Sequence, residues 1–215
     1  MIEALDAYYR AHGIHPEDFR CNFRSSCASG CDDFTEARAS LVGWNYDGLV
    51  FLSLDPGKGW SPIEERTFEA VQARERQRSE KKWKLHWRET HRLAEALLGG
   101  PARGRFAHVN AAKCTQNKQG NAQADRHLFE NCRGYLRDEL AILEPRVVVT
   151  QGKKAHAAYE PIADARDVDE YRSVTDTGVL WIRAYHPSAR GYYWNQKREH
   201  WGTWAEWINQ SPKGA

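Results

Sequence analysis

Three polar side chains that could do chemistry each follow an apolar segment. Asp55 follows the uncharged run 49–54, Asn110 closes a second apolar segment, and His186 comes shortly after a third. A short apolar run that ends in polar, Pro or Gly residues is typical of a buried strand leading into a loop. Ligands of open α/β sheets bind at the carboxyl ends of parallel strands, so we expect these side chains to converge. An acid, an amide and an imidazole together suit hydrolysis of a polar heterocyclic substrate.

The rest of the chain supplies the elements that would position these groups. The expected strands are 48–54, 105–110, 146–150 and 179–184. The expected helices are 1 to about 20, 61–98, 125–143, a helix from 152 onward, and about 195–209. Strands that alternate with helices indicate a parallel sheet covered on both faces. We therefore predict one three-layer α/β/α domain over 1–215, with a central four-stranded parallel sheet and a Cys-rich loop at 21–31.

Composition narrows the possible functions. The formal net charge of +2 means that an acidic partner would need a local basic face. No stretch approaches the ~20 apolar residues of a membrane span, and the N-terminus carries early acids in place of an apolar signal region. We expect a cytoplasmic monomer without a membrane partner. The five cysteines are then metal ligands or plain thiols more readily than disulfides.

Each feature also has a simpler interpretation. Asp55-Pro56-Gly57 is a common surface-turn sequence, and Asn110 is a common residue at the start of a loop. The densely charged stretch 74–84 is typical of a solvated helix face or a mobile linker. Neither a Walker-type loop nor a G-x-G-x-x-G loop is present, which argues against a nucleotide-binding enzyme.

Four motifs in order along the chain resemble the uracil-DNA glycosylase superfamily, and most closely its iron–sulfur branch of the family 4 and family 5 type. They are Ser53-Leu54-Asp55-Pro56-Gly57, His108-Val109-Asn110-Ala111-Ala112-Lys113-Cys114, the segment from Cys132 to Gly152, and His186-Pro187-Ser188. The resemblance covers about residues 20–190. It implies a monofunctional DNA glycosylase that removes uracil or a C5-modified pyrimidine from DNA.

The resemblance implies roles for the residues of the motifs. Asp55 would position water or stabilise the sugar cation, His186 would donate to the carbonyl oxygen of the leaving base, and Asn110 would read the edge of the base. Gly57 stands where branches strict for uracil carry a bulky ring, so a base with a C5 substituent could enter.

The base must be flipped out of the duplex and stacked on an aromatic ring. Phe68 is the candidate by its offset from Asp55, and Trp60 competes with it. The expected DNA contacts are Lys58, Lys153, Ser188 and Arg190, with Lys113 and Lys154 as further lysines near the same loops. Arg190 stands at the usual place of an apolar wedge, which Tyr192 or Tyr193 could supply instead.

The resemblance places a 4Fe–4S cluster on Cys114 and Cys132 together with two cysteines of the N-terminal loop. Cys27 and Cys31 are favoured for that pair, with Cys21 next. A zinc site is the alternative, and free core thiols are the simplest reading.

Two further readings of function stay open. One is a glycosylase that acts on hydroxymethylated or glucosylated phage bases in antiviral defence. The other is a non-catalytic iron–sulfur module that binds nucleic acid and has kept the fold.

Overall fold

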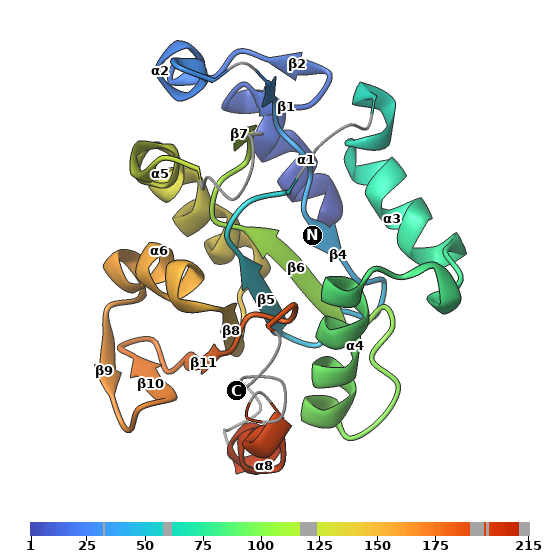
Figure 1. The fold of residues 1–215 in the computed structure, drawn as a ribbon, viewed down its shortest axis with the longest axis vertical. Coiled ribbons are helices and arrows are strands. Elements are labelled where there is room, and N and C mark those ends of the chain that lie inside the picture. The colour runs from blue at the N-terminus through green and yellow to red at the C-terminus, as the bar shows by residue number, and fades with distance from the viewer. Residues whose placement is uncertain (32, 58–61, 117–123, 190–195, 197, 211–215) are drawn as a thin grey trace.

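The computed structural model describes residues 1–215 except 32, 58–61, 117–123, 190–195, 197 and 211–215. Its centre is a seven-stranded mixed sheet with the strand order β4-β6-β5-β8-β11-β10-β9 (Figure 1). The strands are β4 Leu41–Val42, β5 Leu49–Ser53, β6 Phe106–Asn110, β8 Val147–Gln151, β9 Ala165–Asp167, β10 Arg172–Thr175 and β11 Leu180–Ala184. The four central strands are parallel, and β4, β10 and β9 are antiparallel additions at the edges.

The four segments predicted as strands form this parallel centre, but the prediction of a four-stranded sheet is wrong in number. The three edge strands lack an apolar run that would reveal them in the sequence. β4 has only two residues, and β9 and β10 contain charged and polar residues. The central strands β5 and β8 are buried at every position, as expected for a parallel sheet covered on both faces.

Helices cover both faces of the sheet, with α5 and α6 on one side and α3 and α4 on the other (Figure 1). The helices are α1 Ile2–Ala11, α2 Arg24–Ala28, α3 Phe68–Gln77, α4 Leu85–Leu98, α5 Arg126–Leu143, α6 Lys153–Ala163 and α8 Trp201–Gln210. Two 3-10 turns, η1 Ile63–Glu65 and η2 Glu80–Lys82, and two small ribbons, β1 Ile14–His15 with β2 Asp18–Phe19 and β3 Phe34–Thr35 with β7 Thr115–Gln116, complete the fold. In the described part of the chain, no helix is long and apolar enough to cross a membrane.

The single long helix predicted over 61–98 is wrong. The Thr67 side chain accepts a hydrogen bond from Ala70 N at 3.2 Å and begins α3 there. Arg78 has an extended backbone at the end of α3, and Lys84 has one at the start of α4. The segment between these helices is therefore bent, and this bend matters for the cavity described below.

The register of the parallel strands places their carboxyl ends at one edge of the sheet. Ser53 of β5 pairs with Asn110 of β6, and Gln151 of β8 pairs with Ala184 of β11. Each of these strands then leads directly into a loop at that edge. The residues predicted to do chemistry follow three of these strand ends.

Gly43, in the turn after β4, tests how tightly the sheet edge is packed. A Cβ at this position would lie 2.3 Å from the carbonyl carbon and oxygen of Gly104. We expect Gly43→Ala to lower the free energy of unfolding by roughly 2–3 kcal/mol, because backbone must move to admit the methyl group. Urea unfolding would measure this change.

The matched control is Gly134→Ala in α5, where no atom lies within 4 Å of the new Cβ. Alanine replaces a flexible glycine inside a helix there, so stability should rise by roughly 0.5–1 kcal/mol. Equal effects of the two substitutions would contradict the packing at Gly43.

Candidate active site

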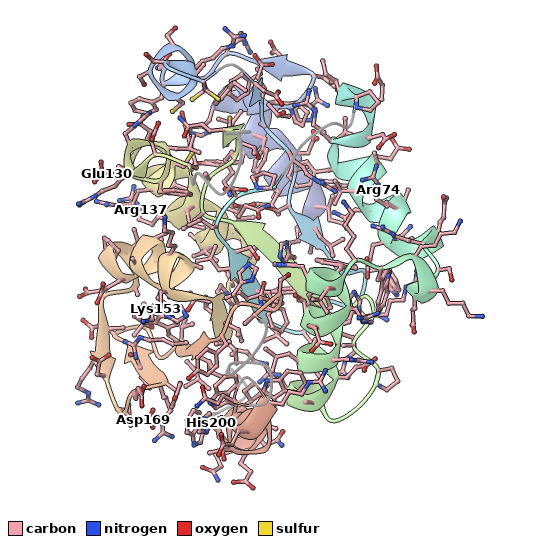
Figure 2. The ribbon with its side chains drawn as sticks, in the orientation of Figure 1. Arg74, Glu130, Arg137, Lys153, Asp169 and His200 are labelled. Atoms are coloured by element: carbon pink, nitrogen blue, oxygen red, sulfur yellow. The ribbon has the colours of Figure 1, made fainter. Side chains whose placement is uncertain are left out.

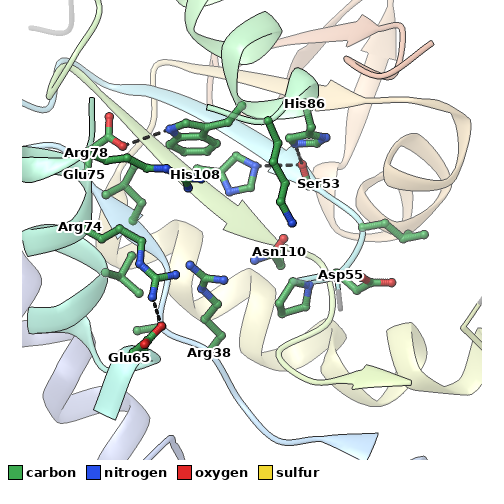
Figure 3. Close-up of a pocket in the computed structure, with 18 of the residues that line it drawn as sticks. Arg38, Ser53, Asp55, Glu65, Arg74, Glu75, Arg78, His86, His108 and Asn110 are labelled. Carbon is green, nitrogen blue, oxygen red and sulfur yellow. Dashed lines mark hydrogen bonds and ion pairs between the residues drawn. The ribbon is translucent and has the colours of Figure 1, made fainter. Parts of the chain in front are cut away.

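A cavity of about 820 Å³ opens at the edge of the sheet where the parallel strands end (Figure 3). Four residues that the sequence singled out line it, namely Asp55, Gly57, Asn110 and His186. The wall also contains residues that the sequence did not single out, among them Arg38, Ser53, Glu65, Arg74, Glu75, Arg78, Lys84, His86, Trp87 and His108. The acid, the amide and the imidazole therefore reach one common space.

Asp55 lies in a tight turn directly after β5. The backbone N–H of Gly57 donates to Asp55 Oδ1 at 2.7 Å and holds the carboxylate in place. Burial raises the pKa of Asp55, and the Gly57 hydrogen bond partly opposes this rise. A raised pKa makes the carboxylate a better proton acceptor near neutral pH.

Gly57 completes the turn with a φ of 71°, in the left-handed region that glycine tolerates best. Among the described residues, no atom lies within 4 Å of the position that a Cβ would take there. These residues therefore leave space beside Gly57.

Asn110 closes β6 and lies 7% exposed in the wall of the cavity. Its carbonyl oxygen accepts a hydrogen bond from Lys113 Nζ at 2.9 Å, so its backbone is held from the side away from the cavity. Its side-chain Oδ1 is buried and has no hydrogen-bond partner among the described residues. A buried acceptor left unpaired costs roughly 1–3 kcal/mol, so Oδ1 is suited to a donor on a ligand.

His186 follows β11, and its ring packs against His86 with centroids 5.3 Å apart. Gly152 allows this position, because a Cβ there would lie 3.1 Å from His186 Cβ. The backbone N–H of Ser188 donates to His186 Nδ1 at 3.1 Å. Since Nδ1 accepts this bond, the neutral ring carries its proton on Nε2 and can act as a hydrogen-bond donor.

A polar network beneath the cavity was not predicted. Ser53 Oγ donates to Gln151 Oε1 at 2.8 Å and contacts His108 Nε2 at 2.9 Å. Because the Ser53 proton is used toward Gln151, His108 Nε2 must donate to Ser53. Gln151 Nε2 in turn donates to Thr90 Oγ1 at 2.9 Å, which ties β8 to α4. Ser53 and His108 could have been found from the sequence, because each is a polar residue within an otherwise apolar strand.

The charged stretch 74–84 was predicted to be a solvated face or a linker, and this prediction is wrong for the residues that line the cavity. Arg74 lines the cavity from within α3, and Arg78 and Lys84 line it from the two ends of the bent segment. Arg74 pairs with Glu65, and Arg78 Nη2 donates to Lys82 O at 2.8 Å. The sequence alone could not show which side of a bent segment faces inward.

The two candidates for the stacking ring lie elsewhere. Phe68 is 3% exposed in the core, where its ring meets that of Tyr9 at 4.8 Å, and it is not among the cavity-lining residues. The prediction that Phe68 stacks on a base is therefore not supported by its position. Trp60 lies outside the described residues. Trp87 does line the cavity, and its Nε1 donates to Glu75 Oε2 at 3.1 Å.

Only some of the residues predicted to contact DNA lie in the described part of the chain. Ser188 lies in the turn after His186, close to the cavity. Lys153 is exposed at the start of α6, on the opposite side of the molecule from Arg74 (Figure 2). Lys113 is buried in an ion pair with Glu139, which corrects its reading as a phosphate contact. Lys58, Arg190, Tyr192 and Tyr193 lie outside the described residues.

The cysteines gather in one region near α2 and α5 (Figure 2). Cys27, Cys114 and Cys132 share a small buried cluster. Burial raises the pKa of Cys114, and the charges of Cys132, Cys21 and Cys27 raise it further. These thiols therefore lie within electrostatic reach of one another, so that ionising one would raise the cost of ionising the next.

Cys31 stands apart from this group, because its thiol donates to Asp33 O at 3.2 Å. Cys21, in contrast, is among the residues whose charge acts on Cys114, and the choice between Cys31 and Cys21 as a ligand stays a prediction. Hydrogen bonds already reach two of the sulfurs, from Lys113 N to Cys132 Sγ at 3.5 Å and from Asn131 Nδ2 to Cys27 Sγ at 3.3 Å. Within the described ranges, no three His, Cys, Asp or Glu side chains form a ready-made metal site.

Acidification is expected to destabilise the fold through His86. Burial, and next the charge of His186, lowers the pKa of His86 to about 4, against about 6.5 for an ordinary histidine. Between these pH values the unfolded chain binds more protons than the folded protein, so the free energy of unfolding falls as the pH is lowered.

Urea unfolding at pH 7 and pH 4.5 would measure this effect. The wild type should lose roughly 2–3 kcal/mol more between these pH values than His86→Asn. Equal losses in the two proteins would show that His86 is not held neutral in the cavity wall.

The model of the uracil DNA glycosylase superfamily matches residues 47–208, which is most of the chain and contains the cavity loops after β5, β6 and β11. A search of curated proteins found no match. Members of the superfamily are hydrolytic glycosylases that act on DNA. The chain belongs to the uracil DNA glycosylase superfamily.

Proposed function

We propose that this protein is a monofunctional DNA glycosylase that hydrolyses the N-glycosidic bond of uracil or of a C5-modified pyrimidine and leaves an abasic site. The observation that carries the proposal is the buried, unpartnered Oδ1 of Asn110 in a cavity shared with Asp55 and His186. A pyrimidine edge offers the N–H donor that this oxygen lacks. The base reaches the cavity only after it is flipped out of the duplex.

Two charges develop as the glycosidic bond breaks, and the cavity has a group for each. The leaving base becomes anionic, and His186 Nε2–H donates to its carbonyl oxygen. The sugar becomes cationic, and the Asp55 carboxylate stabilises it or orients the attacking water. Preorganised groups of this kind are the main source of rate acceleration in such sites. His186 acts here as a neutral donor, because Nδ1 already accepts from Ser188 N.

We assign the stacking ring to Trp87 or Trp60 in place of Phe68. Trp87 lines the cavity and is anchored through its Nε1, whereas Phe68 packs in the core. Ser188 remains our candidate for the DNA backbone next to the flipped nucleotide. Lys153 is a candidate for a more distant phosphate.

The choice of base follows from Gly57 and from the size of the cavity. No atom of the described residues lies within 4 Å of the Gly57 Cβ position, and a cavity of about 820 Å³ exceeds the space that one pyrimidine ring needs. A substituent on C5 can be accommodated in this space. Such a range suits either repair or defence against phage DNA with hydroxymethylated or glucosylated bases.

We also propose that a 4Fe–4S cluster is bound by Cys21, Cys27, Cys114 and Cys132, as in the iron–sulfur branch of the superfamily. Four thiols within electrostatic reach, with hydrogen bonds to two sulfurs, support a site for thiolate ligands here, and zinc is the alternative metal. The cluster would tie the N-terminal loop to α5 and has no step in the hydrolysis.

Mass spectrometry of released bases tests the reaction. Duplexes that contain uracil, 5-hydroxymethylated or glucosylated pyrimidines would be incubated with wild type, Asp55→Asn and His186→Ala. Each variant should release base roughly 10²–10⁴-fold more slowly, because it loses a charge-stabilising group. DNA binding and thermal unfolding would show that the variants are folded.

Asp169→Asn is a matched control for Asp55→Asn. Asp169 Oδ1 accepts from Tyr171 N at 2.9 Å in the same kind of turn, but far from the cavity. Its release rate should equal that of the wild type. Intact DNA binding without release of any base would favour the non-catalytic module.

Gly57→Tyr tests substrate choice. A ring at this position should slow excision of C5-substituted bases by roughly 10-fold or more relative to uracil, because it fills the open side of the cavity. Gly57→Ala imposes the same backbone strain without the ring, so it should keep the wild-type preference. If Gly57→Tyr excises C5-substituted bases as the wild type does, Gly57 does not set the substrate.

Iron and sulfide analysis of Cys21→Ser and Cys31→Ser tests the cluster. We expect brown wild-type protein, loss of iron in Cys21→Ser and full iron in Cys31→Ser. The opposite pattern would restore Cys31 as the ligand, and zinc as the sole metal would rule out the iron–sulfur proposal.

A further inference from the structure

Arg38 lines the cavity, and its positive charge has no ion-pair partner in the described part of the chain. Its backbone N–H donates to Lys113 O at 3.1 Å, so the chain at this point is tied to the loop after β6. Its side chain lies beside Arg74, across the cavity from Asn110 and Asp55 (Figure 3). Within the described ranges, no carboxylate or carbonyl group pairs with its guanidinium.

The residues around Arg38 add further positive charge to this part of the cavity wall. Burial lowers the pKa of Arg38, and the positive charges of Arg74, Arg78 and Arg66 lower it further, while Glu65 opposes them. A charge that is removed from water without a counter-charge is costly. The wall therefore favours binding of an anion over an empty state.

The nearest acidic side chains do not supply the missing charge. Glu65 is already paired with Arg74. Glu75 lies 3.0 Å from His91 Nε2 through one oxygen and accepts from Trp87 Nε1 at 3.1 Å through the other. Glu65 is thus engaged elsewhere, and among the described residues no ion pair joins Glu75 to Arg38.

We propose that Arg38, with Arg74 and Arg78 beside it, forms an oxyanion subsite in the cavity wall opposite the base-reading edge. Guanidinium groups match phosphate and carboxylate oxygens with two parallel hydrogen bonds, so this chemistry suits a phosphate or carboxylate of the substrate. The source is either a backbone phosphate beside the flipped nucleotide or an acidic group on the C5 substituent. The inference rests on the proposed function only in taking DNA as the ligand.

Binding to a duplex with a tetrahydrofuran abasic analogue tests the backbone source, because this DNA has the sugar-phosphate chain but no base to excise. We expect Arg38→Gln to weaken binding about 10-fold and to reduce the salt dependence by about one counterion. Methylphosphonates would then replace the phosphates around the analogue one at a time. At one position the wild type should lose about as much affinity as Arg38→Gln does, and the variant should lose nothing further.

Duplexes with a 5-carboxylated or a 5-hydroxymethylated pyrimidine test the other source. If the acidic substituent is the ligand, wild type should bind the carboxylated duplex about 10-fold more tightly than the hydroxymethylated one, and Arg38→Gln should bind both alike. The subsite would be overturned if the losses from Arg38→Gln and from each methylphosphonate simply added at every position, and if the wild type also showed no preference for the carboxylated base.

Two control variants separate this role from a structural one. Arg38→Lys keeps the charge but loses the two-pronged geometry, so its affinity should be intermediate. Arg137→Gln removes an exposed arginine of α5 on the far side from Arg74 and should bind as the wild type does (Figure 2). Thermal unfolding of Arg38→Gln should match or exceed the wild type, and a clear loss of stability would assign Arg38 to the fold instead. Arg38→Gln could cancel the effect of one methylphosphonate or of the carboxylated base while the wild type releases no base. That result would overturn the proposed reaction and leave the subsite standing.

Discussion

The buried ion pair of Lys113 and Glu139 connects the parts of this protein that must keep their relative positions. Lys113 Nζ also donates to Asn110 O at 2.9 Å, and Tyr9 OH donates to Glu139 Oε1 at 2.8 Å. The backbone N–H of the same lysine donates to Cys132 Sγ at 3.5 Å. Removing one partner of such a pair typically costs roughly 3–5 kcal/mol, because a buried charge is left alone. The end of β6 at Asn110, α1 and the cysteine cluster are therefore coupled through this one ion pair.

The cavity above this ion pair has two chemically different sides. Asp55, Asn110 and His186 lie where the parallel strands end, and the polar network around Ser53 supports them from below. Arginines from the segments around β4 and α3 occupy the other side. The imidazole of His86 packs against His186 and stays neutral near pH 7, since burial lowers its pKa to about 4. A neutral base edge and an anionic group can thus be bound in separate places.

Predictions from the sequence were reliable where a pattern depends on nearest neighbours along the chain. Apolar runs located all four parallel strands, and the polar residues that follow them marked the loops of the cavity. Predictions failed where the outcome depends on distant contacts. Phe68 had a suitable offset from Asp55 but packs against Tyr9 of α1. The preference for Cys31 as a ligand, made for its spacing, stays a prediction, and the folded chain adds that the charge of Cys21 acts on Cys114.

By itself, the sequence determined the alternation of strands and helices, the glycosylase motifs and the identity of the acid, the amide and the imidazole. Local apolarity and turn chemistry carry that information. Only the tertiary structure decided that part of the charged stretch 74–84 lines the cavity and that Arg38 faces it with no ion-pair partner among the described residues. The physical reason is that the sequence shows which residues are charged but not whether water or protein surrounds them. Its energetic meaning arises only when folding removes the water and chooses its neighbours.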